Sequence, residues 1–225
     1  MAYILQIDTS TENAVVSLSD NEQILKAVTS NDQKNHASFL QPAIKSIVDD
    51  CKLSFTQLDA IGVIIGPGSY TGLRVGLASA KGLCYALKKP LLTLNTLEVM
   101  ALTARLNSEA DYYCPMIDAR RLEVFTAVYN NNLQPVVTPC ALVLDADSFD
   151  TMFLNKTVAL NGNGAKKFMD ISGNKNLTYI DSSISPTAMA KLFTAHLNSG
   201  NFADVAYSEP FYAKPFYTLA PKTLK

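Results

Sequence analysis

The fold is decided by the stretch Gly66-Pro-Gly-Ser-Tyr-Thr-Gly-Leu-Arg-Val-Gly-Leu-Ala-Ser-Ala-Lys-Gly82. It follows the apolar run 60–65, which is typical of a buried strand. The glycines and proline at 66–68 predict a tight turn, because glycine adopts backbone angles that other residues resist. A helix is expected to begin near Ser69 to Thr71, whose hydroxyl groups can cap free backbone amides, and to run to about Leu87.

Small residues recur every four positions on one face of that helix, at Gly72, Gly76 and Ala80. Such a face lets a phosphate, a partner helix or another part of this fold approach closely. The segment is not a P-loop, because no lysine stands where that motif requires one. It also lacks the dinucleotide fingerprint, whose third glycine would fall on Thr71. The sequence therefore argues against both nucleotide motifs.

The amino-acid composition is that of an ordinary globular protein. The chain has 225 residues, 48% hydrophobic and 17% charged, enough for one large or two small domains. Its formal net charge of −1 argues against a stand-alone nucleic-acid binder. The four cysteines stand far apart in the sequence, which is typical of a cytosolic protein whose cysteines are reduced thiols. Neither a signal peptide nor a membrane span of ~20 apolar residues is recognisable, so we expect a cytoplasmic protein that makes no membrane contact.

Alternating and apolar patterns predict a meander of three strands at 4–7, 14–18 and 23–29. A helix over about 35–51 follows, and Pro42 would suit its first turn if Ser38 and Gln41 formed a capping box. Strand 60–65, the small-residue helix and strand 91–94 come next. The order β-β-β-α-β-α-β is that of a ribonuclease H-like unit, in which crossover helices lead to parallel strands.

The second half of the chain starts in the same way as the first. Ile7-Asp8 and Ile117-Asp118 each end a predicted strand, and a polar turn and an alternating strand follow both times. Later elements continue the alternation, namely a strand at 124–129, a helix at 145–153, a strand at 158–160, the turn Gly162-Asn163-Gly164, a strand at 177–180 and a helix at 186–198. We predict two ribonuclease H-like subdomains, 1–105 and 106–225, the second with an extended proline- and tyrosine-containing tail. This is the α/β architecture of the acetate-kinase, sugar-kinase, Hsp70 and actin superfamily.

These residues resemble the TsaB (YeaZ) family, a subunit of the bacterial machinery that makes N6-threonylcarbamoyladenosine in tRNA. The segment Gly66–Leu77, which includes Arg74, and the segment Met116–Arg121 together carry the resemblance. Weaker matches are Ile7–Thr11, Asn35-His36, Ala80–Gly82, Leu160–Gly164 and the tail. The tail departs from the family pattern, because Tyr212-Ala213-Lys214 stands where the family often has Tyr-Leu-Arg.

The resemblance implies a non-catalytic scaffold that pairs with a TsaD-like catalytic subunit and enables a TsaE-like ATPase to join. The complex would transfer threonylcarbamoyl to adenosine 37 of tRNAs that read codons beginning with A, and this chain would meet tRNA only through the complex. TsaD holds its metal with two histidines of an Asn-His-x-Glu-x-His segment. The corresponding positions here are Thr96 and Met100, which are poor ligands for a divalent cation. We therefore expect no catalytic residue, metal or cofactor.

The resemblance also implies a partner surface on the helices 35–51 and 69–87, used by TsaD and, in its absence, by a second copy of this chain. We expect the bulky Leu73 and Leu77 to meet the sheet, which would turn the small-residue stripe outward. Gly76→Arg would then leave the fold intact and abolish association. The candidate contact residues are His36, Phe39, Leu40, Gly72, Gly76, Ser79 and Ala80.

Kinases of the superfamily place an aspartate like Asp8 before a glycine-bearing turn that holds magnesium and phosphate. Here Thr9, Ser10 and Thr11 fill the first turn and Arg120 and Arg121 the second, so we expect Asp8 to bond its own turn and ATP to bind weakly. Gly162 and Gly164 resemble an adenosine-contacting turn. Arg120 and Arg121, which follow the motif residue Asp118, form either a contact for a partner carboxylate or RNA phosphate or a solvated turn. A kinase-like phosphotransferase that uses Asp8 and a metallo-endopeptidase, as the family was once labelled, are the alternatives.

Overall fold

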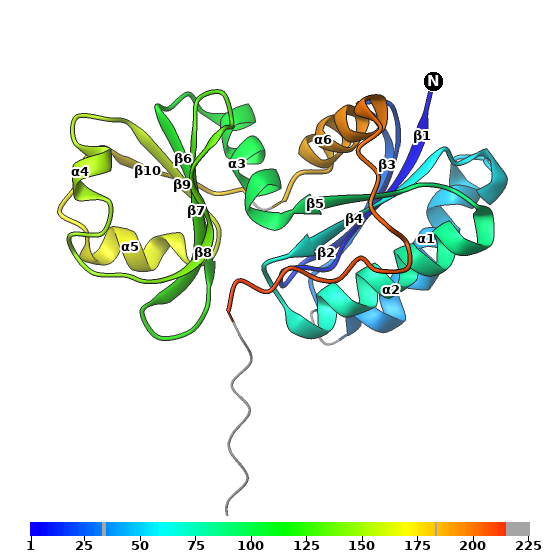
Figure 1. Ribbon diagram of the computed structural model, residues 1–225, viewed down its shortest axis with the longest axis horizontal. Coiled ribbons are helices and arrows are strands. Elements are labelled where there is room, and N and C mark those ends of the chain that lie inside the picture. Colours follow the sequence, from blue (N-terminus) through cyan, green and yellow to red (C-terminus); the bar gives the residue numbers. More distant parts are fainter. Residues whose placement is uncertain (33–34, 183, 215–225) are drawn as a thin grey trace, which may run out of the picture.

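Two mixed five-stranded sheets form the two lobes of the structure, a computed structural model that describes residues 1–32, 35–182 and 184–214 (Figure 1). The first sheet has the strand order β3-β2-β1-β4-β5 and the second β10-β9-β6-β7-β8. The strands of the first sheet are β1 (Tyr3–Asp8), β2 (Ala14–Asp20), β3 (Gln23–Ser30), β4 (Ala60–Gly66) and β5 (Leu91–Asn95). Those of the second are β6 (Tyr112–Asp118), β7 (Glu123–Asn130), β8 (Pro135–Val143), β9 (Val158–Asn161) and β10 (Leu177–Ile180).

The two sheets share one topology. In each, the first three strands form an antiparallel meander, and two more strands then add in parallel beside the first strand of the meander. This order is that of the ribonuclease H-like unit, repeated once. The predicted architecture of the acetate-kinase, sugar-kinase, Hsp70 and actin superfamily is therefore confirmed.

Helices cover both sheets. They are α1 (His36–Asp50), α2 (Tyr70–Leu87), α3 (Thr96–Asn107), α4 (Asp150–Phe153), α5 (Ala165–Ile171) and α6 (Pro186–Ser199), with a 3-10 turn η2 (Phe55–Gln57). Successive residues of β1 point to opposite faces of the first sheet. Leu5 clusters with side chains of α1 and α2, whereas Ile4 clusters with Phe193 of α6. Helices α1 and α2 therefore cover one face of this sheet and α6 covers the other.

Helix α3 leaves the first sheet and packs on the second, against β6, β9 and β7, and it also contacts α6. In Figure 1, α3 and α6 lie beside each other between the two sheets. The predicted boundary between residues 105 and 106 separates the two sheets, but α6 follows it in sequence and packs on the first sheet. The division into two subdomains at this residue stays a prediction.

The sequence predicted where most helices and strands begin and end, but two of its predictions for helices are wrong. The Ser69 hydroxyl accepts a bond from the Gly72 amide at 3.3 Å and caps α2, as predicted. Helix α1 begins at His36, so Pro42 lies past its first turn, and the Ser38 hydroxyl bonds the Asn35 carbonyl instead of forming the expected capping box. The helix expected at 145–153 is confined to α4. None of the helices in the described ranges is long and apolar enough to cross a membrane.

Candidate functional site

The N-terminal turn of α2 packs directly against the loop between β1 and β2, called here the β1–β2 turn. The Ser69 amide donates to the Ser10 carbonyl at 2.7 Å, and the Thr9 hydroxyl donates to the Gly72 carbonyl at 2.7 Å. A Cβ atom at Gly68 would overlap the Ser10 carbonyl, and one at Gly72 would overlap the Thr9 carbonyl. Glycine at these two positions allows the two backbones to touch. The close neighbour of the glycine motif is thus another part of this fold.

The predicted small-residue stripe faces inward, which corrects the expectation that it faces a partner. Gly72, Gly76 and Ala80 are all buried, and a Cβ at Gly76 would already overlap the Thr9 hydroxyl. Leu73 and Leu77 are buried as well, so the sheet-facing side of α2 is broad enough to include both rows. An arginine at Gly76 would therefore disrupt the fold, contrary to the prediction.

Asp8 bonds its own turn, as expected. Its Oδ1 accepts from the Ser10 amide at 2.8 Å and from the Ser10 hydroxyl at 2.6 Å. The side chain is fully buried, and this burial raises the pKa of Asp8 to about 6. Its Oδ2 has no hydrogen-bond partner among the described residues. Thr9 and Ser10 are also buried, and α2 covers their backbone, so this turn does not fit the phosphate of a nucleotide.

A cleft of about 490 Å³ lies between the lobes, next to these turns. Its walls include parts of four motifs found in the sequence: the β1–β2 turn, the start of α2, the β6–β7 turn and the turn Gly162-Asn163-Gly164. They include Ser10, Thr11, Glu12, Gly68, Ser69, Tyr70, Thr71, Ile117, Asp118, Arg120, Phe125 and Asn163. The fold therefore brings the separate motifs to one place.

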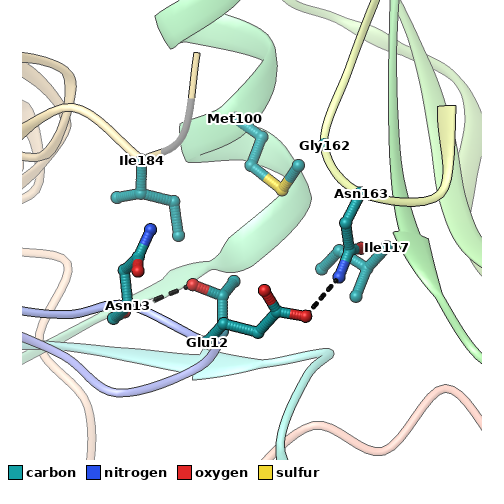
Figure 2. A pocket seen from close by; sticks show the side chains of 8 residues that line it. Glu12, Asn13, Met100, Ile117, Gly162, Asn163 and Ile184 are labelled. Atoms are coloured by element: carbon teal, nitrogen blue, oxygen red, sulfur yellow. Dashed lines mark hydrogen bonds between the residues drawn. The ribbon is translucent and has the colours of Figure 1, made fainter. Parts of the chain in front are cut away.

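A smaller pocket of about 100 Å³ lies beside this cleft and is lined by Met100 and Ile184 (Figure 2). Figure 2 shows Glu12 of the first lobe and Asn163 of the second pointing toward each other, and the Asn163 amide donates to Glu12 Oε1 at 3.3 Å. Asn163 Oδ1 also accepts from the Asp118 amide at 2.8 Å. The sequence pointed to the flanking glycines but not to Asn163 and Glu12, which form one of the bonds between the lobes.

The β6–β7 turn is held by its own polar groups. Asp118 Oδ1 accepts from Lys167 Nζ at 2.6 Å and from the Arg120 amide, and the bond from Lys167 lowers the pKa of Asp118. Arg120 and Arg121 have left-handed backbone angles, with φ of 75° and 54°, and their side chains are exposed. Asp118 therefore orders the turn that carries the two arginines.

Thr96 and Met100, which the sequence analysis compared with the metal-binding histidines of TsaD, are buried at the start of α3. Met100 lies against Gly162, where a Cβ would overlap its methyl group, and a Cβ at Gly164 would overlap Val124. These glycines are thus required for packing within the chain. Within the described residues, no three His, Cys, Asp or Glu side chains gather as a metal site would require.

The outer face of α1 and α2 differs from the predicted contact set. His36 and Leu40 lie buried, and His36 Nε2 is 3.1 Å from the Glu12 carbonyl oxygen. Phe39 and Ser79 are half-buried, and Gln41 Nε2 donates to the Ser79 hydroxyl at 3.0 Å between the helices. The exposed residues of α2 are Tyr70, Thr71, Arg74, Ala78, Gly82, Tyr85 and Ala86.

A second small-residue row therefore faces outward. Ala78, Gly82 and Ala86 stand four residues apart and are exposed, and a Cβ at Gly82 would meet no atom within 4 Å. Beside them Tyr85 is 84% exposed. Sequence reasoning missed this row, although its four-residue spacing was as visible as that of the buried one.

Comparisons with known proteins agree with the fold and its motifs. A family model described as "TsaD: tRNA N6-adenosine threonylcarbamoyltransferase" matches residues 23–219. The "tRNA threonylcarbamoyladenosine biosynthesis protein TsaB" of Bacillus subtilis (strain 168) is 35% identical over 146 residues, which is 64% of this chain and 63% of that protein. The protein of the same name from Escherichia coli (strain K12) is 33% identical over 57% of this chain and 55% of its own length. The matches thus span somewhat over half the length of these curated relatives.

A solved structure supports the fold alone. It is an uncharacterized protein with similarity to peptidase YEAZ from Pseudomonas aeruginosa, and it superposes with a TM-score of 0.79 at 24% identity. The superposition covers 95% of this chain and all of that one. Since the family model matches most of the sequence, the chain belongs to the family described as TsaD, tRNA N6-adenosine threonylcarbamoyltransferase, and within it to the TsaB (YeaZ) group.

Proposed function

We propose that this chain is a non-catalytic scaffold subunit in tRNA threonylcarbamoyladenosine biosynthesis. It pairs with a TsaD-like catalytic subunit and enables a TsaE-like ATPase to join the complex in the cytoplasm. The complex modifies adenosine 37 of tRNAs that read codons beginning with A. The names of the relatives support the process, and the buried Thr96 and Met100 support the non-catalytic role.

The main support for the proposed pairing is the outer face of α1 and α2, which is the side of these helices that points away from the first sheet. Ala78, Gly82 and Ala86 let a second helix approach α2 closely, since interaxial distances depend on the side chains at the contact. The exposed Tyr85 beside them is of the residue type enriched among the residues that dominate binding energy. Phe39 and Ser79 lie half-buried on these helices. The same face supports a homodimer when the TsaD-like subunit is absent.

Recognition of tRNA is assigned to the complex and not to this chain alone. Phosphate contacts dominate the affinity of proteins for nucleic acids, and the net charge here is −1. Next to the β6–β7 turn, the charge of Lys167 on α5 is already paired with Asp118. The exposed Arg120 and Arg121 then add contacts to RNA only where a partner supplies the remaining positive charge.

The test is reconstitution with the TsaD-like and TsaE-like proteins of the same organism, followed by a tRNA modification assay with each part omitted. Gly82→Arg, which meets open space, should fold normally, weaken pairing by about a hundredfold and abolish modification. Ala195→Arg on the exposed side of α6 is the matched control, because it adds the same side chain away from α1 and α2. Wild-type pairing of Gly82→Arg would place the interface elsewhere. Modification without the TsaD-like subunit would refute the non-catalytic role.

A further inference from the structure

The tail after α6 returns across the first lobe and fastens to α2 and β4. Lys81 Nζ of α2 donates to the carbonyls of Ala206 and Ser208, at 2.9 and 3.1 Å. The Phe211 amide donates to the Ile65 carbonyl at the end of β4, at 2.7 Å. Figure 1 shows this segment running along α2 toward the gap between the lobes. The path of the tail is thus fixed by main-chain bonds at several points.

An aromatic cluster fixes the tail next to the start of α2. Arg74 Nε donates to the Tyr212 hydroxyl at 3.0 Å, and the guanidinium carbon lies 3.9 Å from the centre of the Tyr70 ring. The rings of Tyr70 and Tyr212 have centres 5.5 Å apart. Arginine stacks favourably on aromatic faces while its N–H groups donate hydrogen bonds. One guanidinium therefore joins the tail to a wall of the cleft, because Tyr70 lines that cleft.

The tail then reaches the second lobe. Lys214 Nζ lies 2.6 Å from Glu123 Oε2, and Glu123 is the first residue of β7, directly after the turn of Arg120 and Arg121. The Glu123 side chain is only 18% exposed, which reduces the screening of this pair by solvent. Residues 206–214 are thus bonded to both lobes. In Figure 1 they run on the side of the molecule opposite α3 and α6.

We propose that residues 206–214 form a strap that holds the two lobes at a fixed separation across the cleft. Helices α3 and α6 join the lobes on one side, and the strap ties them on the other. Because Arg74 and Lys81 fasten the strap to α2, the lobe separation is also coupled to the helix whose outer face is the proposed partner surface. The strap gives a role to the Tyr-Ala-Lys tail at 212–214, which departs from the family pattern.

Hydrogen exchange measured by mass spectrometry on the full chain tests the strap. Tyr212→Ala should release the Phe211 amide and speed exchange about tenfold in the cleft segments 10–13 and 117–120, with no change in the middle of α1. Tyr207→Ala is the matched control, because Tyr207 belongs to the same tail but its side chain is 84% exposed. This control should exchange like the wild type throughout.

Unchanged exchange in the cleft segments while the Phe211 amide is released would overturn the proposal. Should Phe211 stay protected in Tyr212→Ala, a chain that ends after Val205 removes the strap outright. Wild-type exchange in the cleft of that shortened chain would equally overturn it. These outcomes do not depend on the partner, so they are distinct from a failure of the proposed pairing.

Discussion

Two glycines of α2 test which side of this helix meets the sheet. A Cβ at Gly72 would lie well inside 3.0 Å of the Thr9 carbonyl oxygen, whereas one at Gly82 would meet no atom within 4 Å. Alanine favours a helix over glycine by about 1 kcal/mol, so Gly82→Ala should raise the free energy of unfolding by about that amount. Gly72→Ala must instead push α2 away from the β1–β2 turn.

The cost of that displacement follows from the contacts it disturbs. The bonds from the Ser69 amide to Ser10 and from the Thr9 hydroxyl to Gly72 are worth about 1 kcal/mol each. Overpacking costs a further ~1 to 3 kcal/mol, and the helix preference of alanine offsets about 1 kcal/mol of the total. We expect Gly72→Ala to lower the free energy of unfolding by about 2 to 4 kcal/mol, measured by urea unfolding followed with circular dichroism. A Gly72→Ala variant as stable as Gly82→Ala would refute the buried position of this stripe.

The remaining predictions concern Asp8 and the cleft. Because burial raises the pKa of Asp8 to about 6, above its ordinary 3.8, the folded chain holds this proton more tightly than the unfolded chain. Protonation of Asp8 therefore stabilises the folded wild type fully below about pH 4, and this stabilisation is lost as the pH rises through 6. The non-ionisable Asp8→Asn variant does not lose it. Between about pH 4 and pH 8 its free energy of unfolding should therefore rise by up to about 3 kcal/mol relative to that of the wild type. Urea unfolding at both pH values measures this gain, and a pH-independent difference would contradict it. Since α2 covers the β1–β2 turn, calorimetry on the isolated chain should detect no tight ATP binding; a micromolar Kd would show that the cleft accepts the nucleotide.

Much of the fold was predictable because its signals are local. The first meander and the first two strands of the second follow from short alternating runs, whereas β8, the third strand of the second meander, was not predicted. The start of α2 follows from a hydroxyl placed before a helix. The bond of Asp8 to its own turn is likewise a local event, common for aspartate after a strand. The repeat of Ile-Asp before a polar turn, at 7–8 and 117–118, together with the α/β alternation that follows the second copy, predicted that one topology occurs twice.

The orientation of α2 was not predictable from spacing. Its small residues form two rows, one through Gly76 and one through Gly82, and helical periodicity fits both equally well. The row through Gly76 faces inward because the backbone of the β1–β2 turn lies so close to α2 that there is no space for a Cβ at Gly72. The pair Glu12 and Asn163 was missed for a related reason, because only the three-dimensional arrangement brings two such distant residues together.

The glycine motif anchors α2 on the β1–β2 turn, and this anchoring also affects the partner surface that we propose. Bonds from the β1–β2 turn fix the first turn of α2, the bond from Arg74 to Tyr212 fixes its flank, and the bond from Gln41 to Ser79 ties it to α1. A face held in this way loses little conformational freedom when a partner binds, so more of the contact energy appears as affinity. The close packing of α2 on the β1–β2 turn therefore has two effects: it leaves no space for a phosphate, and it makes the outer face of α1 and α2 rigid.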